Sequence, residues 1–357
     1  MRIAEFVSSE LPFPLPAGEV FAPIDVVNDL VDGFVKKGHD VTWYAPAGTK
    51  TSGQLRDCGI EPVRLQSHYT EKNDAGRAIQ SIFFDEVFLA NVVNDADQFD
   101  VIHLHSTRIA LPFCRLLKKP VIITLHNPFD SDFAIKQTEL HKDLTNVHYV
   151  SISDNQRKPN PGIDYVKTIY HGMNLDEHPW TEKGEDRWLF VGRVVPNKGA
   201  HTAIEIAKKA GVKLDIAGPT YDDPKNREYF NTQIKPHVDG DQIRFLGPLP
   251  KEHLFSYYYP ASTGLLFPLQ WEEPFGLTVI ESLAAGSPVV AFPRGSMPEL
   301  IEPGKTGFLP RNIEEAVTAV KNVNSISRAT CRYVAEQRFS SDRVTDDYLE
   351  VFAKLAK

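Results

Sequence analysis

Two glutamates, Glu273 and Glu281, frame a stretch with the pattern of a short loop entering a helix. Pro274 suits the first turn of that helix, because its missing N–H would have no intrahelical partner there. At a rise of ~1.5 Å per residue, the two carboxylates are roughly 12 Å apart along the helix axis. A hydrolytic carboxylate pair flanks one bond at roughly 5–10 Å, so this spacing does not fit hydrolysis. It fits the two ends of one extended ligand, held at a helix N-terminus that favours anions.

The residue types in this stretch suit hydroxyl and phosphate groups. A carboxylate accepts two hydrogen bonds, so Glu281, placed among apolar neighbours, matches the paired hydroxyls of a ribose. The alternative is a structural carboxylate satisfied by backbone groups. The helix start offers free backbone N–H groups, and its glycine lets a ligand approach closely. The residues at this start are Phe275, Gly276, Leu277 and Thr278.

Two cations follow a predicted strand at residues 188–191. Arg193 comes directly after it, and Lys198 precedes the next predicted helix. Since both leave the carboxyl end of a strand, we expect them at the ligand-binding edge of a parallel sheet. Fixed cations there would neutralise a diphosphate, and more strongly as it leaves. The alternative is a solvated basic turn.

Three histidines lie at or near strand ends in the first half of the chain. His126 follows the predicted strand 121–125 and could donate a hydrogen bond to a phosphate oxygen or a sugar hydroxyl. The alternative is a hydrogen-bonded structural histidine. His103 and His105 alternate along one strand and are interpreted as core or rim residues. No carboxylate or cysteine has matching metal-ligand spacing, so we predict no metal site.

Composition narrows the class of protein. The chain has 357 residues, enough for two domains with full cores, and a net charge of −8 that gives no support to a nucleic-acid partner. Three cysteines lie far apart, which favours a reducing, cytoplasmic setting. We find no signal sequence and no run long enough to span a membrane. No Gly-x-Gly-x-x-Gly follows the first strand, so a dinucleotide cofactor is not expected.

Short apolar strands alternate with helices in two successive sets, which predicts an α/β fold with two doubly wound, Rossmann-like domains. Ligands of such sheets bind outside the carboxyl ends of the strands, so two domains facing each other would form a cleft. The predicted domains are residues 1–172, residues 173–338, and a C-terminal helix at 339–357 that packs back on the first domain. The predicted strands lie at 3–8, 39–45, 100–105, 121–125, 147–151, 188–191, 213–217, 243–245, 264–267 and 288–292.

Taken together, these segments resemble the retaining glycosyltransferases of family 4, which have the two-domain GT-B fold. The resemblance covers nearly the whole chain. Its most specific part is the pair of glutamates with Pro-Phe-Gly-Leu between them. Further segments in the family's order are Lys37–Val41, Tyr170–Asn174, Gly192-Arg193 with Asn197–Gly199, and Gly304–Phe308.

The resemblance implies a role for each site residue in the second domain. Arg193 and Lys198 would bind the donor diphosphate in place of a divalent ion, so no metal and no other cofactor is implied. Glu281 would bind the nucleotide ribose. Glu273, with the backbone of Phe275, Gly276, Leu277 and Thr278, would hold the donor sugar and the distal phosphate.

Two further contacts are implied. His126 would line the cleft near the sugar, and Leu249 would meet the base through its backbone. One departure concerns the first βα loop, where the family has two adjacent glycines. That place holds Phe21-Ala22, with Gly18 as the nearest substitute. Either the loop is re-routed through Gly18, which would then contact the donor, or the first domain binds its ligand differently.

The sequence therefore predicts a retaining transferase that moves a hexose from a nucleoside diphosphate sugar to an acceptor hydroxyl. UDP-glucose is the favoured donor and GDP-mannose the next. The acceptor is unidentified, and the acidic first domain favours a soluble one. One alternative is a nucleotide-sugar epimerase or a phosphorylase on the same fold. Another is a non-catalytic nucleotide-sugar-binding protein.

Overall fold

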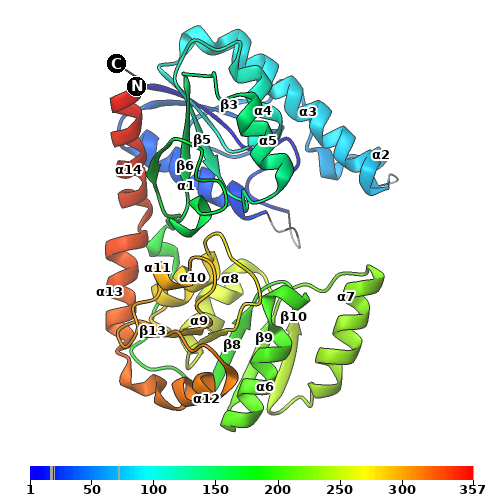
Figure 1. The fold of residues 1–357 in the computed structure, drawn as a ribbon, viewed down its shortest axis with the longest axis vertical. Coiled ribbons are helices and arrows are strands. Elements are labelled where there is room, and N and C mark those ends of the chain that lie inside the picture. Colours follow the sequence, from blue (N-terminus) through cyan, green and yellow to red (C-terminus); the bar gives the residue numbers. More distant parts are fainter. Residues whose placement is uncertain (17–18, 20, 71–72, 357) are drawn as a thin grey trace. The chain divides into compact units, whose positions relative to one another are not determined.

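A computed structural model describes residues 1–16, 19, 21–70 and 73–356 (Figure 1). The chain divides into two compact units. Unit 1 comprises residues 1–172 and 341–357, and unit 2 comprises residues 173–340. The ends of unit 2 meet each other, since the backbone N–H of Met173 donates to the carbonyl of Phe339 at 2.9 Å.

Unit 1 is built on a seven-stranded parallel sheet with the order β3-β2-β1-β4-β5-β6-β7. The strands are β1 (Arg2–Phe6), β2 (Asp40–Tyr44), β3 (Gln54–Arg56), β4 (Val101–Leu104), β5 (Val121–Leu125), β6 (Val147–Ser151) and β7 (Tyr165–Thr168). The helices are α1 (Ala22–Lys36), α2 (Ser67–Thr70), α3 (Asp74–Asp95), α4 (Thr107–Cys114), α5 (Asp132–Leu140) and α14 (Ser341–Leu355). Every residue of β4 and β5 is buried, as expected for central strands covered on both faces.

The C-terminal helix α14 packs on α1 within unit 1 (Figure 1). Its apolar face is buried, and the ring of Phe352 lies 5.4 Å from that of Phe34. The helices approach so closely that a Cβ at Gly33 would overlap Oγ1 of Thr345. A glycine at this position of α1 therefore permits the docking of α14.

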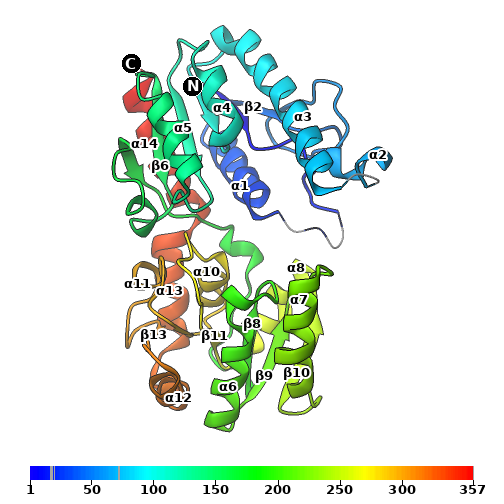
Figure 2. The ribbon, with the colours of Figure 1, turned by 45° about the vertical axis from the view of Figure 1, so that its right-hand side comes forward.

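Unit 2 is built on a six-stranded parallel sheet with the order β10-β9-β8-β11-β12-β13. The strands are β8 (Arg187–Val191), β9 (Lys213–Ala217), β10 (Ile243–Gly247), β11 (Leu265–Phe267), β12 (Val289–Ala291) and β13 (Gly307–Phe308). The helices are α6 (Ala200–Ala210), α7 (Pro224–Tyr229), α8 (Lys251–His253), α9 (Tyr259–Ala261), α10 (Leu277–Ala284), α11 (Met297–Leu300), α12 (Ile313–Asn322) and α13 (Arg328–Phe339). Helix α6 packs against β9, next to it in Figure 2.

These two sheets confirm the predicted α/β fold with two Rossmann-like domains. The prediction that Pro274 lies in the first turn of a helix is wrong. Helix α10 begins at Leu277, after Gly276, whose φ of 105° belongs to the left-handed region. Pro274 therefore lies in the loop before the helix, and Glu273 belongs to that loop too. Within the described part of the chain, no helix is long and apolar enough to cross a bilayer.

Candidate functional site

The centre of the candidate site is an ion pair between Lys198 and Glu273. The Lys198 ammonium contacts Oε2 of Glu273, and the side chains are only 12% and 13% exposed. Trp271 donates its indole N–H to the same oxygen at 3.0 Å. The Lys198 nitrogen also lies 4.9 Å from the centre of the Trp271 ring, within cation–π range. Two donors thus hold the Glu273 carboxylate in place, and the structure brings together two residues that the sequence placed on different parts of the ligand.

The loops that carry these two residues pack closely and are joined by a backbone hydrogen bond. Lys198 ends a 3-10 turn, and the Gly199 that follows has a φ of 81°. A Cβ at Gly199 would overlap the carbonyl of Pro268, so only glycine lets the start of α6 approach the loop after β11. The backbone N–H of Gln270 donates to the carbonyl of Asn197 at 2.9 Å. These contacts fix Lys198 beside Glu273.

Arg193 is placed differently from Lys198. It follows β8, its side chain is exposed, and it makes no ion pair with any residue that the structure describes. A guanidinium in this state can bind an anionic ligand without first breaking an internal salt bridge.

Glu281 lies on α10 and accepts a hydrogen bond of 2.6 Å from the hydroxyl of Tyr259. Tyr259 is fully buried, and burial, followed by the Glu281 charge, raises its pKa well above the usual value. Tyr259 therefore stays protonated and serves as a donor that orients the carboxylate. Nothing in the sequence marked Tyr259, because it precedes Glu281 by 22 residues on a separate element.

The predicted backbone donors fall into two groups. Phe275 is an anchor, since its ring is 2% exposed and its carbonyl accepts a hydrogen bond from the Ser296 hydroxyl. Leu277 and Thr278 form the first turn of α10, where no described side chain caps the helix. The N–H of Val279 donates to the carbonyl of Gly276 at 3.0 Å, whereas those of Leu277 and Thr278 precede this first bond of the helix and are suited to an anionic or hydroxyl ligand.

The loop after β12, which contains Gly295, packs against the backbone of Glu273. Gly295 follows β12 with a φ of 60°, and a Cβ there would overlap the backbone nitrogen and oxygen of Glu273. The N–H of Gly295 donates to the Glu272 carboxylate at 2.7 Å, and the N–H of Ser296 donates to the carbonyl of Glu273 at 3.0 Å. Gly295 is a positioning residue that sequence inspection missed.

Gly295→Ala is expected to lower the free energy of unfolding by more than Gly304→Ala. Both glycines have positive φ, which costs an L-residue roughly 1–2 kcal/mol. A Cβ at Gly304 has no described atom within 4 Å, whereas one at Gly295 overlaps backbone. Urea denaturation of both variants measures the difference. Equal losses would mean that the close approach to Glu273 is not required.

Two further donor contacts were predicted, at Leu249 in the second domain and at Gly18 in the first βα loop. Leu249 follows β10 and is partly exposed, and the turn before it is held by a 2.8 Å hydrogen bond from the N–H of Gly218 to the carbonyl of Gly247. Its backbone therefore lies at the carboxyl edge of the unit 2 sheet. Gly18 lies outside the described residues.

In unit 1, His126 is half-buried among other histidines. Its Nε2 lies 2.7 Å from Nδ1 of His105, and its Nδ1 lies 3.4 Å from Nε2 of His171. Burial, followed by the neighbouring histidines, lowers its pKa well below the ordinary value, so the ring is neutral at physiological pH.

His105 and His103 share a carboxylate that sequence spacing did not reveal. Glu5 on β1 is fully buried, with one oxygen 2.9 Å from Nδ1 of His103 and the other 3.1 Å from Nε2 of His105. Metal-ligand spacing along the chain did not point to Glu5, because it lies on β1, which neighbours β4 in the sheet and places Glu5 in register with His103. The ligand atoms of these three residues lie within 4.8 Å of one another, close enough to hold a metal ion.

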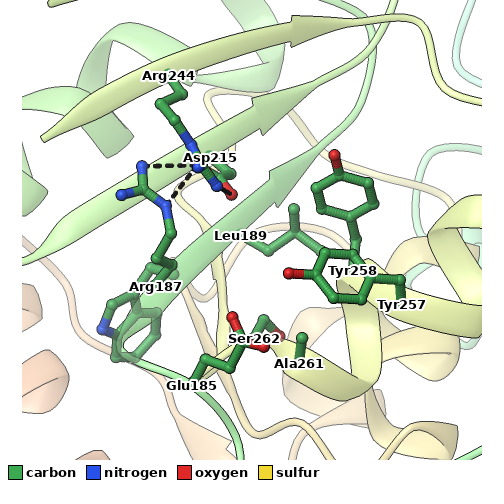
Figure 3. Close-up of a pocket in the computed structure, with 10 residues that line it drawn as sticks. Glu185, Arg187, Leu189, Asp215, Arg244, Tyr257, Tyr258, Ala261 and Ser262 are labelled. Atoms are coloured by element: carbon green, nitrogen blue, oxygen red, sulfur yellow. Dashed lines mark hydrogen bonds and ion pairs between the residues drawn. The ribbon is translucent and has the colours of Figure 1, made fainter. Parts of the chain in front are cut away.

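Two pockets lie in unit 2. Figure 3 shows a small cavity of about 20 Å³ near the amino ends of the strands, where Arg187 and Arg244 converge on the buried Asp215. Asp215 forms ion pairs with both arginines, which indicates a structural cluster. A larger open pocket of about 480 Å³ includes Gln270 and Arg294, the neighbours of Trp271 and Gly295. The larger pocket therefore adjoins the Glu273 loop.

Comparison with protein families gives two adjoining matches. Residues 25–176 match the profile described as Glycosyltransferase Family 4, and residues 176–337 match the one described as Glycosyl transferases group 1. Spore coat protein SA of Bacillus subtilis (strain 168) is 23% identical over 407 aligned positions, covering 99% of this chain and 100% of that protein.

Solved structures share the architecture. AviGT4, a glycosyltransferase involved in avilamycin A biosynthesis, superposes with a TM-score of 0.70 at 21% identity, covering 99% of this chain and 98% of the other. Alr3699/HepE of Anabaena, solved in complex with UDP and glucose, gives a TM-score of 0.70 at 16% identity, with 99% of each chain covered. At these identities the likeness establishes the shared fold.

Proposed function

Because the chain belongs to the GT-B glycosyltransferases of family 4, we propose that it moves a hexose from a nucleoside diphosphate sugar to an acceptor hydroxyl with retention of configuration. The observation that carries this proposal is the Lys198–Glu273 pair, held beside the uncapped start of α10. It offers a cation for a phosphate, a carboxylate for sugar hydroxyls, and backbone N–H groups for either.

Each residue then has a proposed role. Arg193 and Lys198 bind the diphosphate and stabilise its growing charge as the glycosidic bond breaks. Glu273 holds the donor sugar and stabilises the oxocarbenium-like state that this cleavage passes through. Glu281, oriented by Tyr259, accepts hydrogen bonds from the ribose hydroxyls.

Two contacts complete the proposal. The backbone at Leu249 meets the base, and His126 of unit 1 binds a substrate group. The complex of Alr3699/HepE with UDP and glucose supports UDP-glucose as the first donor to test, with GDP-mannose next. A soluble acceptor remains our expectation.

A thermal-shift panel of nucleotides and nucleotide sugars tests the donor class. A ligand that binds only the folded state raises Tm, by an amount that grows with its concentration above Kd. We expect UDP and UDP-glucose to raise Tm and free glucose to leave it unchanged. A chain that responds to no nucleoside diphosphate, and that neither transfers nor hydrolyses any nucleotide sugar, would refute the proposal.

Transfer is expected to be insensitive to EDTA. Arg193 and Lys198 supply the positive charge that a divalent ion would otherwise give to the leaving diphosphate. Rates measured before and after chelation, and again after adding Mg²⁺ or Mn²⁺, check this expectation. Strict dependence on either ion would assign the charge stabilisation to a metal instead.

A further inference from the structure

A line of hydrogen-bonded side chains runs through the core of unit 1 to His126. It starts on α14, where the Tyr348 hydroxyl lies 2.9 Å from that of Thr124, which in turn lies 2.8 Å from Nε2 of His103. Beyond His103 it passes through Glu5 and His105. We call it the Glu5 relay; its members are Tyr348, Thr124, His103, Glu5, His105 and His126.

Glu5 fixes the direction of every hydrogen bond in the relay. An ionised carboxylate only accepts, so both histidines beside it must donate. Burial lowers the pKa of His103 to about 3 and that of His105 to about 4, so each ring is neutral and has a single N–H. His103 therefore donates from Nδ1 and His105 from Nε2, the atoms that face the carboxylate.

The remaining nitrogens must then accept. His103 Nε2 accepts from the Thr124 hydroxyl, on the arm of the relay that leads to Tyr348. On the other arm, His105 Nδ1 accepts at 2.7 Å from His126, whose proton must therefore be on Nε2. Nδ1 of His126 is left as an acceptor. It has a long hydrogen bond, 3.4 Å from Nε2 of His171, which a shorter bond from a substrate hydroxyl would replace.

On the basis of the proposed function, which makes His126 a substrate-binding residue, we propose that Glu5 is a positioning residue for it. Through His105, Glu5 keeps the His126 proton on Nε2, so that Nδ1 accepts a hydrogen bond from a substrate hydroxyl. A phosphate diester oxygen carries no proton, so it cannot donate a hydrogen bond to Nδ1. The sequence allowed His126 to serve either group, and the relay selects the hydroxyl.

The hydrogen bonds of the relay have these directions above neutral pH, where Glu5 is ionised. Burial raises the pKa of Glu5 to about 7, and the hydrogen bond from His105 opposes that rise. The titratable groups that face Glu5 are His103 on β4, His105 in the bend just after it, and Tyr348 on α14, whose pKa burial raises. Trp43 of β2, opposite Glu5 in the sheet, is not ionisable. On α3, the buried Asp85 is bound to the N–H of Ser9.

Nitrogen-15 NMR of histidine-labelled, ligand-free protein tests the proton positions directly. The spectrum is recorded at about pH 8.5, where an acid with a pKa near 7 is ionised. We expect the proton on Nε2 of His105 and His126 and on Nδ1 of His103. A His126 proton on Nδ1, or one exchanging between both nitrogens, would overturn the inference. A spectrum in which added Zn²⁺ shifts the nitrogens of His103 and His105 would also overturn it, by showing a metal site.

A matched pair of variants connects the proton position with catalysis. His105→Phe and His103→Phe each keep a ring and remove one donor from Glu5, but only His105 contacts His126. We expect His105→Phe to lower kcat roughly 10- to 100-fold, the scale for groups that orient a functional histidine. His103→Phe keeps the contacts from Glu5 through His105 to His126, so it should lower kcat less than His105→Phe does. Equal kcat values in the two variants would contradict the proposal.

These measurements separate two kinds of failure. The wild-type spectrum needs no substrate and no variant, so it remains decisive if either substitution prevents folding. The predicted proton pattern in a chain with no transferase activity would refute the proposed function alone. Active wild-type enzyme with the His126 proton on Nδ1 would refute the role of Glu5 alone.

Discussion

Lys198→Ala is expected to lower kcat for sugar transfer by about 100-fold or more, the scale of losing one charge-stabilising contact in a water-excluded site. Lys198 is 12% exposed, so its ammonium acts in a medium that screens charge poorly. Removing it also leaves the Glu273 carboxylate without its cation. Steady-state kinetics with the donor found by the nucleotide panel measure the effect.

Lys209→Ala is the matched control for this loss. Lys209 lies on α6, is 48% exposed, and pairs with Glu205 and Glu314 at the surface. Exposed pairs of this kind contribute little, so transfer should stay near wild type. Arg193→Ala should behave like Lys198→Ala. Wild-type activity in both the Arg193 and the Lys198 variants would refute the diphosphate assignment.

Glu273→Gln is expected to lower transfer by about 100-fold or more while UDP binding is retained or strengthened. Glutamine keeps the shape of the side chain and can still accept from Trp271, but it carries no charge to stabilise an oxocarbenium-like state. It also frees Lys198 from an internal ion pair, which makes that cation more available to a phosphate. Steady-state kinetics measure the rate of transfer, and isothermal titration calorimetry measures the affinity for UDP.

The neighbouring carboxylate provides the control here. Glu272 is exposed and accepts one hydrogen bond from the N–H of Gly295, a contact that a glutamine oxygen can replace. Glu272→Gln should therefore transfer sugar at close to the wild-type rate. If Glu273→Gln lost UDP binding along with transfer, Glu273 would be a nucleotide-binding or structural residue, and its proposed role on the sugar would be wrong.

The fold could be predicted from the sequence where strands are apolar runs between turn signals. The boundaries of β5, β6 and β9 match the predicted ranges. Helix α3 was missed although Phe88, Leu89 and Val92 have helical spacing, because the buried face also carries Ser81 and Asp85. Strands β3 and β13 have three and two residues, too few for periodicity to be recognised.

The candidate site could be predicted as a set of residues but not as a set of contacts. Lys198 and Glu273 are 75 residues apart, and they meet because β8 and β11 are adjacent strands whose following loops leave the same edge. Glu5 and His103 are 98 residues apart and depend in the same way on the order of β1 and β4. Strand order is a tertiary property that residue types alone do not encode.

The return of the chain to unit 1 through α14 has a consequence for synthesis on the ribosome. Lys36 of α1 contacts Asp342 of α14 across 306 residues, so unit 1 is incomplete until α14 has been translated. Unit 2 is one continuous segment and can reach its native state earlier. Until α14 emerges, nascent unit 1 exposes the apolar face that includes Phe34, and chaperones or rapid synthesis of α14 would limit its aggregation.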